Sequence, residues 1–451
     1  MRATRSLWGR RDFLLLWSAQ SVNLLGTHVS LIAVPLLALS VGATPFQVSL
    51  VAAAGHVPYL LAALPAGAVV DRCRRRPIML TAGLLQGLAL STVPIAGAFG
   101  ALTFSHLLAA AFTVALLGVF FDTAYGSYLP SLVPRERLAD ANGKLGASDG
   151  FAYVAGQSAA GALVAWIGAA WTVGVDAVSY LLAAGFLGAI RHREPPPAAG
   201  RPPGRARERA AGFRAEIAEG LRVVFRHRLL RPLFLADAFV NAGIAASWSI
   251  WVVHVVEELR WPAYVVGLSQ GLSALGVIAG GFDLGGLGRR FGMPAVLLAA
   301  APFYVLDLLP TLLVGPGVGG QVVVTAGYLV ALFGEFTYVG ASRTLRQLLC
   351  PPRLLGRVTS ISRWVAQGPR PFVAVAFGGI ATAFGTRTAL VLAAVLFAVP
   401  FAILVTSPIR LLRDVPGPEP EPGSGPRPGA GPGAAGGPAA RGGTGAASEA
   451  K

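Results

Sequence analysis

Long apolar runs alternate with short polar segments along most of the chain. Twelve runs are about 20 residues or longer, and at about 1.5 Å per residue a helix of that length crosses the roughly 30 Å hydrocarbon core of a bilayer. The runs are Phe13–Leu39, Gln47–Val70, Ile78–Phe99, Leu102–Ala124, Leu145–Ile167, Ala170–Ile190, Leu229–Val253, Tyr264–Leu284, Pro294–Val314, Gly319–Val339, Val365–Phe384 and Thr388–Val405. The pattern predicts an all-α membrane protein with twelve transmembrane helices.

The basic residues test this count independently, because they fall in every second connection. Of the 37 Lys and Arg residues, 35 lie in the termini, in the connections after runs two, four, six, eight and ten, or at the adjoining edge of the next run, as Arg231 and Arg370 do; the opposite connections hold only Arg260 and Arg387. Positively charged loops stay on the cytoplasmic side of a membrane. The distribution therefore supports twelve spans and predicts that both termini are cytoplasmic.

Composition excludes several other classes. Hydrophobic residues make up 54% of the 451 residues and charged residues only 13%, with a mean hydropathy of +0.63. A soluble domain usually carries about 25% charged residues. The net charge of +16 is spread between apolar runs rather than gathered on one polar face, so no nucleic-acid partner is expected. Two cysteines, Cys73 and Cys350, are too few for a disulfide framework or a metal site.

The chain divides into two similar halves. We predict an N-terminal six-helix bundle over 1–190, a cytoplasmic linker with an amphipathic helix over 191–228, a C-terminal six-helix bundle over 229–410 and a disordered Pro/Gly-rich tail over 411–451. Four residues in the loop after run four recur 216 positions later, after run ten: Leu129, Leu132, Arg137 and Leu138 match Leu345, Leu348, Arg353 and Leu354. Two repeats joined by a linker are typical of transporters whose site lies between the repeats.

The stretch from Gly67 to Pro77, with the sequence GAVVDRCRRRP, is the most informative motif. A Gly, then the pair Asp71-Arg72, then further basic residues resembles the loop motif of the major facilitator superfamily. That resemblance implies two six-helix bundles and a latch that holds one half against the other in the outward-facing state. Its residues here would be Gly67, Asp71, Arg72, Arg75 and Arg76. The alternative is that the Arg cluster only sets topology.

Other segments resemble one branch of that superfamily, the enterobactin-exporter and macrolide-efflux-like proteins. They are Arg11-Asp12-Phe13 with Trp17 and Gln20, Tyr128 to Leu138, Asp176 to Leu181, and Arg346-Gln-Leu-Leu. The antiporter signature of the fifth span survives only as Gly156 and Gly161. The resemblance covers about residues 10–410.

Polar residues within apolar runs are costly in a bilayer and therefore candidates for function. In the family, spans one, four, seven and ten line the cavity. We predict proton coupling through Asp122, Glu335 or Asp237, with Asp122 preferred because Arg343 and Arg346 are near Glu335 in sequence; ion pairing is the alternative for both preferred acids. Substrate-cavity candidates on the same spans are Gln20, Asn23, His28, Tyr125, Asn241 and Tyr338. Asp176 and Asp307 lie on other spans, which favours structural caps or pairs.

Two matches to the nucleophile motif G-x-S-x-G, at Ser148 and Ser269, fall at or in apolar runs, whereas a nucleophile elbow follows a strand. The sequence has no phosphate-binding loop G-x-x-x-x-G-K-[ST], so ATP is not expected as the direct energy source. We expect no enzyme activity, no cofactor and no metal.

The leading hypothesis is a secondary active transporter, a proton-coupled exporter of a small amphipathic organic compound such as a drug, siderophore or secondary metabolite. Expected partners are the substrate, protons and membrane lipids, with the protein a monomer in a bacterial inner membrane. An importer on the same fold, a non-transporting membrane sensor and a membrane-embedded hydrolase are the alternatives.

Overall fold

The computed structural model describes residues 7–134, 137–192, 194, 225–282, 284–350 and 368–412. The regular secondary structure of these residues is helical. The helices of the first half are η1 (Leu7–Gly9), α1 (Arg11–Ser40), α2 (Pro45–Ala54), α3 (Val57–Arg72), α4 (Arg75–Ala98), α5 (Phe104–Leu132), α6 (Leu138–Ile167) and α7 (Ala169–Ala189). Those of the second half are α9 (Leu230–Glu257), α10 (Ala263–Phe282), α11 (Leu284–Phe291), α12 (Met293–Ala300), η3 (Ala301–Asp307), α13 (Leu309–Leu313), α14 (Val318–Leu349), α16 (Arg370–Phe384), α17 (Thr386–Thr406) and η5 (Pro408–Leu411).

These helices confirm the predicted all-α membrane fold. Within the described residues, 11 helical stretches are long and apolar enough to cross a membrane, and the shorter α16 stands where the eleventh span was predicted. Several helices extend beyond the predicted runs on the side that carries the basic loops: α5 continues to Leu132 and α14 to Leu349. Most of the predicted linker and tail lies outside the described residues, as does the amphipathic segment of the linker.

Two predicted spans are broken rather than continuous. The second consists of α2 and α3, separated at Gly55 and His56. The ninth consists of α12, η3 and α13, and both later segments have a proline at their start, Pro302 and Pro310. Proline has no N–H to donate to the preceding turn and its ring clashes with that turn. The apolar pattern therefore located the spans, while the proline positions coincide with the interruption in the ninth.

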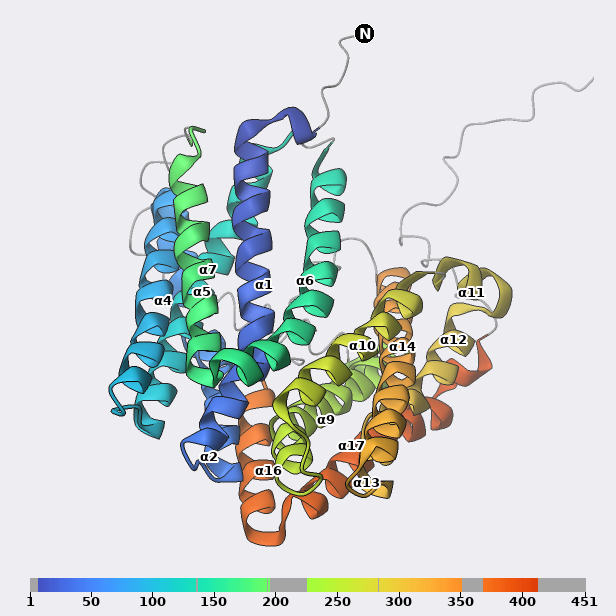
Figure 1. Ribbon diagram of the computed structural model, residues 1–451. Helices are drawn as coiled ribbons and strands as arrows, with labels where there is room; N and C mark the ends of the chain where they lie inside the picture. Colours follow the sequence, from blue (N-terminus) through green and yellow to red (C-terminus); the bar gives the residue numbers. More distant parts are fainter. Residues whose placement is uncertain are drawn as a thin grey trace, which may run out of the picture.

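The two halves meet at one end and separate toward the other (Figure 1). The joined ends pair α6 with α10 and α2 with α16. The backbone N–H of Phe46 on α2 donates to Thr382 Oγ1 on α16 at 3.0 Å. Gly161 on α6 and Gly267 on α10 approach so closely that a Cβ built on Gly267 would stand 2.5 Å from the nitrogen of Gly161. The halves are thus fastened by backbone-level contacts at one end.

The first described helix, η1, and α11, which carries Arg289 and Arg290, lie at the opposite end of the molecule, where the halves diverge (Figure 1). We call this the basic side, since the loop 72–76 and the start of α6 near Lys144 face the same way. Gly161 lies 23 residues beyond the start of α6 at Leu138. The joined end is therefore the end remote from the basic side.

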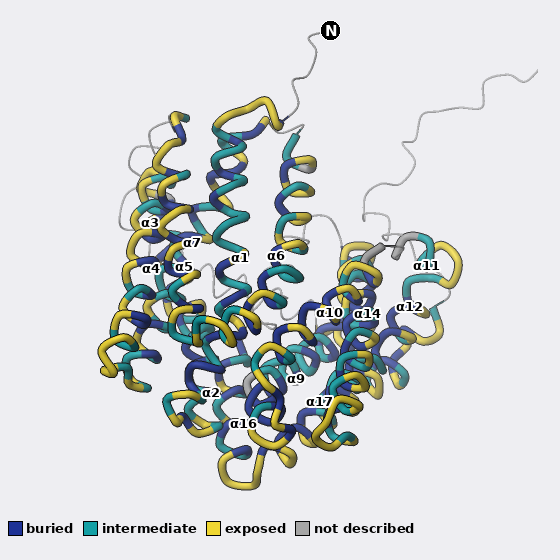
Figure 2. Tube along the Cα trace, in the orientation of Figure 1, coloured by how far each residue is buried: buried dark blue, intermediate teal, exposed yellow. Residues whose placement is uncertain are grey.

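The apolar interior of each half is continuous with the other where the halves join, since Ile32 of α1 belongs to the cluster of the second half and Val253 of α9 to a cluster of the first. In the second half Tyr304 stacks on Phe397 with ring centroids 5.5 Å apart, inside a cluster that includes Ile250 and Leu390. Figure 2 shows that buried residues face the inside of each bundle, while exposed positions lie on the outward faces of the helices. Large apolar side chains such as Trp166, which is 84% exposed, stand on those outward faces. A bilayer rather than water suits such a surface.

Candidate functional site

Asp122 on α5 faces α3, just after the break in the second span. Its carboxylate accepts a hydrogen bond from the Tyr59 hydroxyl on α3, and the residue remains exposed. Tyr125, one turn along α5, is half-buried and its ring stacks on Phe121 at 6.4 Å. His56, at the break itself, lies within electrostatic range of Arg370 on α16. Two candidates from the sequence, Asp122 and Tyr125, therefore share one face of α5.

Asp237 on α9 sits in a polar cluster with α14. Arg346 Nη1 lies 2.9 Å from its Oδ2, the Ser342 hydroxyl donates to both carboxylate oxygens at 3.0 and 3.1 Å, and the Tyr338 hydroxyl donates at 3.2 Å. Both side chains of the ion pair are largely shielded, with 14% of Asp237 and 19% of Arg346 exposed. The carboxylate thus meets the guanidinium of Arg346 and the hydroxyls of Ser342 and Tyr338. The ion pair that Arg346 forms is therefore with Asp237, not with Glu335 as its sequence position suggested.

Asn241 connects α9 to α16. Its Oδ1 accepts a hydrogen bond from Arg370 Nη2 at 2.8 Å, and its Nδ2 donates to the Asp237 carbonyl at 2.8 Å. The predicted candidates Asp237, Asn241 and Tyr338 thus form one connected group in the second half.

Glu335 on α14 is half-buried and faces the ninth span. It lies close enough to Asp307, the last residue of η3, for the two charges to interact directly. No ion pair to either carboxylate occurs in the part of the chain that the structure describes. Asp307 was not among the site candidates. An acidic residue next to Pro310 in an apolar run is the one signal that pointed to it.

The candidate residues on α1 do not join the polar group formed by Asp237, Asn241 and Tyr338 in the second half. His28 Nε2 lies 3.2 Å from Asp149 Oδ1 on α6, and its ring packs edge-to-face on Tyr153 at 5.2 Å. Asn23 and Gln20 are half-buried on α1, and Asn23 Oδ1 has no hydrogen-bond partner among the described residues. His28 therefore joins α1 to α6 within the first half.

The loop motif after α3 makes its described contacts inside the first half. Glu194 Oε2 accepts from the backbone N–H of Arg75 at 2.7 Å, which caps the start of α4, and Arg76 donates to the carbonyls of Leu187 and Gly188 at the end of α7. Arg72 is exposed, and a Cβ at Gly67 would meet open space. The side chain of Asp71 lies outside the described part of the structure. The predicted latch between the halves stays a prediction for another conformation.

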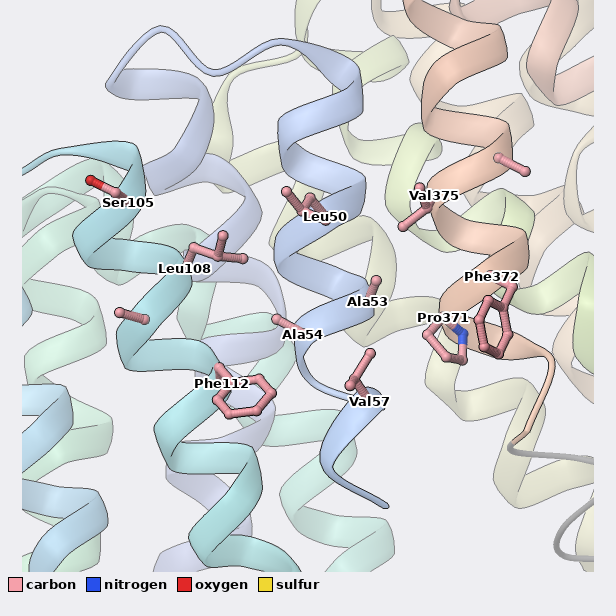
Figure 3. A pocket seen from close by; sticks show the side chains of 12 residues that line it. Leu50, Ala53, Ala54, Val57, Ser105, Leu108, Phe112, Pro371, Phe372 and Val375 are labelled. Carbon is pink, nitrogen blue, oxygen red and sulfur yellow. The ribbon is translucent and has the colours of Figure 1, made fainter. Parts of the chain in front are cut away.

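An apolar pocket opens between the halves beside Asp122's helix. Its volume is about 680 Å³. Figure 3 shows side chains of α2, α5 and α16 lining it, among them Leu50, Phe112 and Phe372. The pocket ends near Val57 and Pro371, the neighbours of His56 and Arg370. An apolar space bordered by a few polar groups suits an amphipathic small molecule.

Both matches to the nucleophile motif lie inside helices. Ser148 is on α6 and accepts a hydrogen bond from Trp17 Nε1 at 2.8 Å; Ser269 is on α10 and accepts one from Thr325 Oγ1. The described residues hold no group of three His, Cys, Asp or Glu side chains suited to a metal. The polar groups therefore lie on packed helices rather than at the strand-to-helix turn that a nucleophile elbow requires.

Comparison with known proteins defines the class of this molecule as a membrane transporter. A family model described as the Major Facilitator Superfamily matches residues 16–370. The chain is 30% identical over 362 residues to the multidrug efflux pump Tap of Mycobacterium tuberculosis (strain ATCC 25618 / H37Rv), covering 76% of this chain and 81% of that protein. It is 22% identical to macrolide efflux protein A of Streptococcus pyogenes, covering 78% and 84%. The chain belongs to the major facilitator superfamily.

Solved structures agree with the fold. A bacterial homologue of the human lysosomal transporter Spinster, in an inward-facing and unoccupied conformation, superposes with a TM-score of 0.66 at 17% identity, covering 89% of this chain and 97% of that one. The nucleoside transporter NupG superposes with a TM-score of 0.70 at 9% identity, covering 87% and 98%. The protein is a multi-pass membrane transporter of a small-molecule substrate and not an enzyme.

Proposed function

We propose that the protein is a proton-coupled exporter that carries a small amphipathic organic compound out of the cell by alternating access. The observation that carries the proposal is the asymmetric junction of the halves, fastened at Gly161 and Gly267 and diverging at the basic side, with membrane-embedded carboxyl groups on both halves. Moving the junction to the other end would expose the same groups to the opposite side. The named efflux pumps at 30% and 22% identity support export of a drug-like compound.

The proposed orientation follows from charge. The basic side faces the cytoplasm, as the positive-inside rule requires, so both termini are cytoplasmic and the conformation is inward-open. The membrane is a bacterial inner membrane and the protein a monomer surrounded by lipid. The two bundles are 1–190 and 229–410, with 191–228 as the linker and 411–451 as a cytoplasmic tail.

Proton coupling is assigned to carboxyl groups that are not already held as ions. Asp237 has Arg346 and three hydroxyl contacts, so losing its charge would leave the guanidinium unpaired. Asp122 has only the Tyr59 hydroxyl, and Glu335 has no cationic partner among the described residues. A neutral carboxyl is much less costly to move within a membrane than a carboxylate. Asp122 and Glu335 are therefore the coupling candidates, with Asp237 third.

The test uses the purified full chain in proteoliposomes with radiolabelled erythromycin as the probe. For transporters inserted with the basic side outward, an acidic interior should drive uptake against the erythromycin gradient, and a protonophore should abolish it. Uptake driven only by an acidic exterior would instead establish import by symport. Binding of erythromycin without any gradient-dependent movement would favour the sensor alternative and overturn the proposal.

A further inference from the structure

Asp307 and Glu335 lie on neighbouring helices that run in opposite directions, close enough for their charges to interact. On one side of them Phe303 packs against Gly334 and Tyr304 packs edge-to-face on Tyr338, with ring centroids 5.3 Å apart. Three residues make one turn of the 3₁₀ segment, so Asp307 stands directly beyond Tyr304. Three residues back along α14 from Tyr338 is Glu335, on the same face of that helix. The packing of the two tyrosines therefore brings the two acids together one turn farther from the basic side.

The register is fixed at both ends of this contact. Beyond the acids, a Cβ on Gly327 of α14 would stand 2.3 Å from Pro310 Cγ, so no larger residue fits there without a shift. Next to Glu335, a Cβ on Gly334 would stand 2.1 Å from the Cβ of Phe303, which lies on the basic side of Asp307. If either helix slid or rotated, these contacts would be lost or would become steric clashes. The juxtaposition of the acids follows from close backbone packing and not from a favourable attraction between them.

The surroundings of the pair are polar but supply no described positive partner. Tyr153 on α6 and Tyr328 on α14 lie within electrostatic range of both acids. Gln157 and Gln270 stand beside these two tyrosines; they are 0% and 1% exposed. Each amide lies within hydrogen-bond reach of the tyrosine beside it, Gln157 of Tyr153 and Gln270 of Tyr328. Buried phenol and amide groups, rather than cations, therefore surround the two acids among the described residues.

The other charged and titratable groups near the pair are accounted for. Arg370 on α16 donates to Asn241, and Arg387 on α17 donates to the carbonyl of Leu312 at 3.3 Å. Asp237 on α9 is paired with Arg346 and is linked to the acids only through Tyr338 and Tyr304. Two carboxylates in such a setting repel each other, and a single proton converts the pair into one hydrogen-bonded unit of charge −1.

We propose that Asp307 and Glu335 together bind one exchangeable proton, and that this pair, rather than Glu335 alone, is the proton site of the second half. Binding forms one O–H bond, and the carboxylic acid then donates to the partner carboxylate; release breaks that bond and returns the proton to water. Tyr304, Tyr338 and Asp237 extend from the pair toward the basic side, which gives the proton a line of polar groups. The use of this proton for export rests on the proposed function, but its binding does not.

Binding is tested without transport, by infrared difference spectroscopy of the purified full chain between acidic and alkaline pH, following the carbonyl band of protonated carboxyl groups. Asp307→Asn and Glu335→Gln should each remove the same band, and the double variant should remove no more. Asp176→Asn is the matched control, because Asp176 accepts hydrogen bonds from Ser30 and Ser179 far from this pair. When Asp176→Asn is combined with Asp307→Asn, the loss of band intensity should be the sum of the losses in the two single variants. Asp307→Glu, which keeps the carboxyl, should restore the band if Asp307→Asn alters the packing.

Two results would refute the proposal that Asp307 and Glu335 share one proton. One is additive loss in the double variant, which means that the acids titrate independently. The other is an unchanged band in Asp307→Asn. The transport arm separates this proposal from the proposed function: the ratio of gradient-driven to gradient-free erythromycin uptake should fall to about 1 in either variant. A wild-type ratio of about 1 with the shared band intact would refute proton-driven export and leave the proton site supported. A wild-type-like ratio in Asp307→Asn would refute the use of this pair in coupling, whereas proton binding by the pair is decided by the infrared band.

Discussion

Replacing Gly267 with alanine should weaken the junction that holds the two halves together. A Cβ at this position would stand 2.5 Å from the nitrogen and 2.6 Å from the Cα of Gly161, and 2.9 Å from the Gln157 carbonyl oxygen. These are backbone atoms, so no side-chain rotation relieves the overlap. An ordinary contact needs about 3.4 Å or more, and α6 and α10 must therefore move apart by about 1 Å.

The size of the effect follows from the cost of overpacking. Inserting a methyl group into a close-packed contact costs about 1–3 kcal/mol. Because α6 belongs to one half and α10 to the other, the cost falls only on the conformation in which this end is joined. A differential cost of that size changes the ratio of open to joined ends about 5- to 150-fold.

The assay is a spin-label distance measurement between Trp166→Cys at the end of α6 and Tyr264→Cys at the start of α10, with Cys73 and Cys350 replaced by Ser. Both labelled positions are exposed, at 84% and 53%. Gly267→Ala should increase the long-distance population.

The matched control is Gly150→Ala on α6, where an added Cβ meets nothing within 4 Å; it should reproduce the parent distances. Equal distance distributions for Gly267→Ala and this control would refute the argument that backbone contact fastens this end.

Three further predictions follow. Asp71→Asn should lower transport without lowering membrane insertion if the loop is a latch, and unchanged efflux from a normally expressed variant would leave the Arg cluster a topological role only. A cysteine beside Arg260 should react with an impermeant thiol reagent from outside the cell and one beside Arg75 should not; labelling of both from one side would contradict twelve spans. Arg346→Gln should lower the unfolding free energy by about 3–5 kcal/mol, since it leaves Asp237 as a shielded, unpaired carboxylate. Adding Asp237→Asn should recover much of that loss in a thermal unfolding assay, and equal midpoints for all three proteins would mean that the pair is not buried in the bilayer.

The sequence determined the number and order of the spans and which connections carry the basic residues, although α5 and α14 run past their predicted ends to Leu132 and Leu349. These properties are local: a run of about 20 apolar residues must cross the bilayer whatever its neighbours are, and charge cannot cross with it. The helical limits of α1 and α17 differ from the predicted runs by only one or two residues at each end. The superfamily resemblance also rested on local motifs, and the comparisons confirmed it.

The tertiary structure alone decided which polar residues meet. Arg346 is closer in sequence to Glu335 than to Asp237, yet it pairs with Asp237 across helices because of how α14 is rotated. Asp307 gave no indication of its partner, since the contact with Glu335 depends on the relative register of two antiparallel helices. That register is set by close contacts at Gly334 and Gly327, whose neighbours come from another span. The length of an apolar run shows where the chain crosses the membrane. The rotation of a helix about its axis and its register with a neighbouring helix depend on packing between helices, which the pattern of a single helix does not encode.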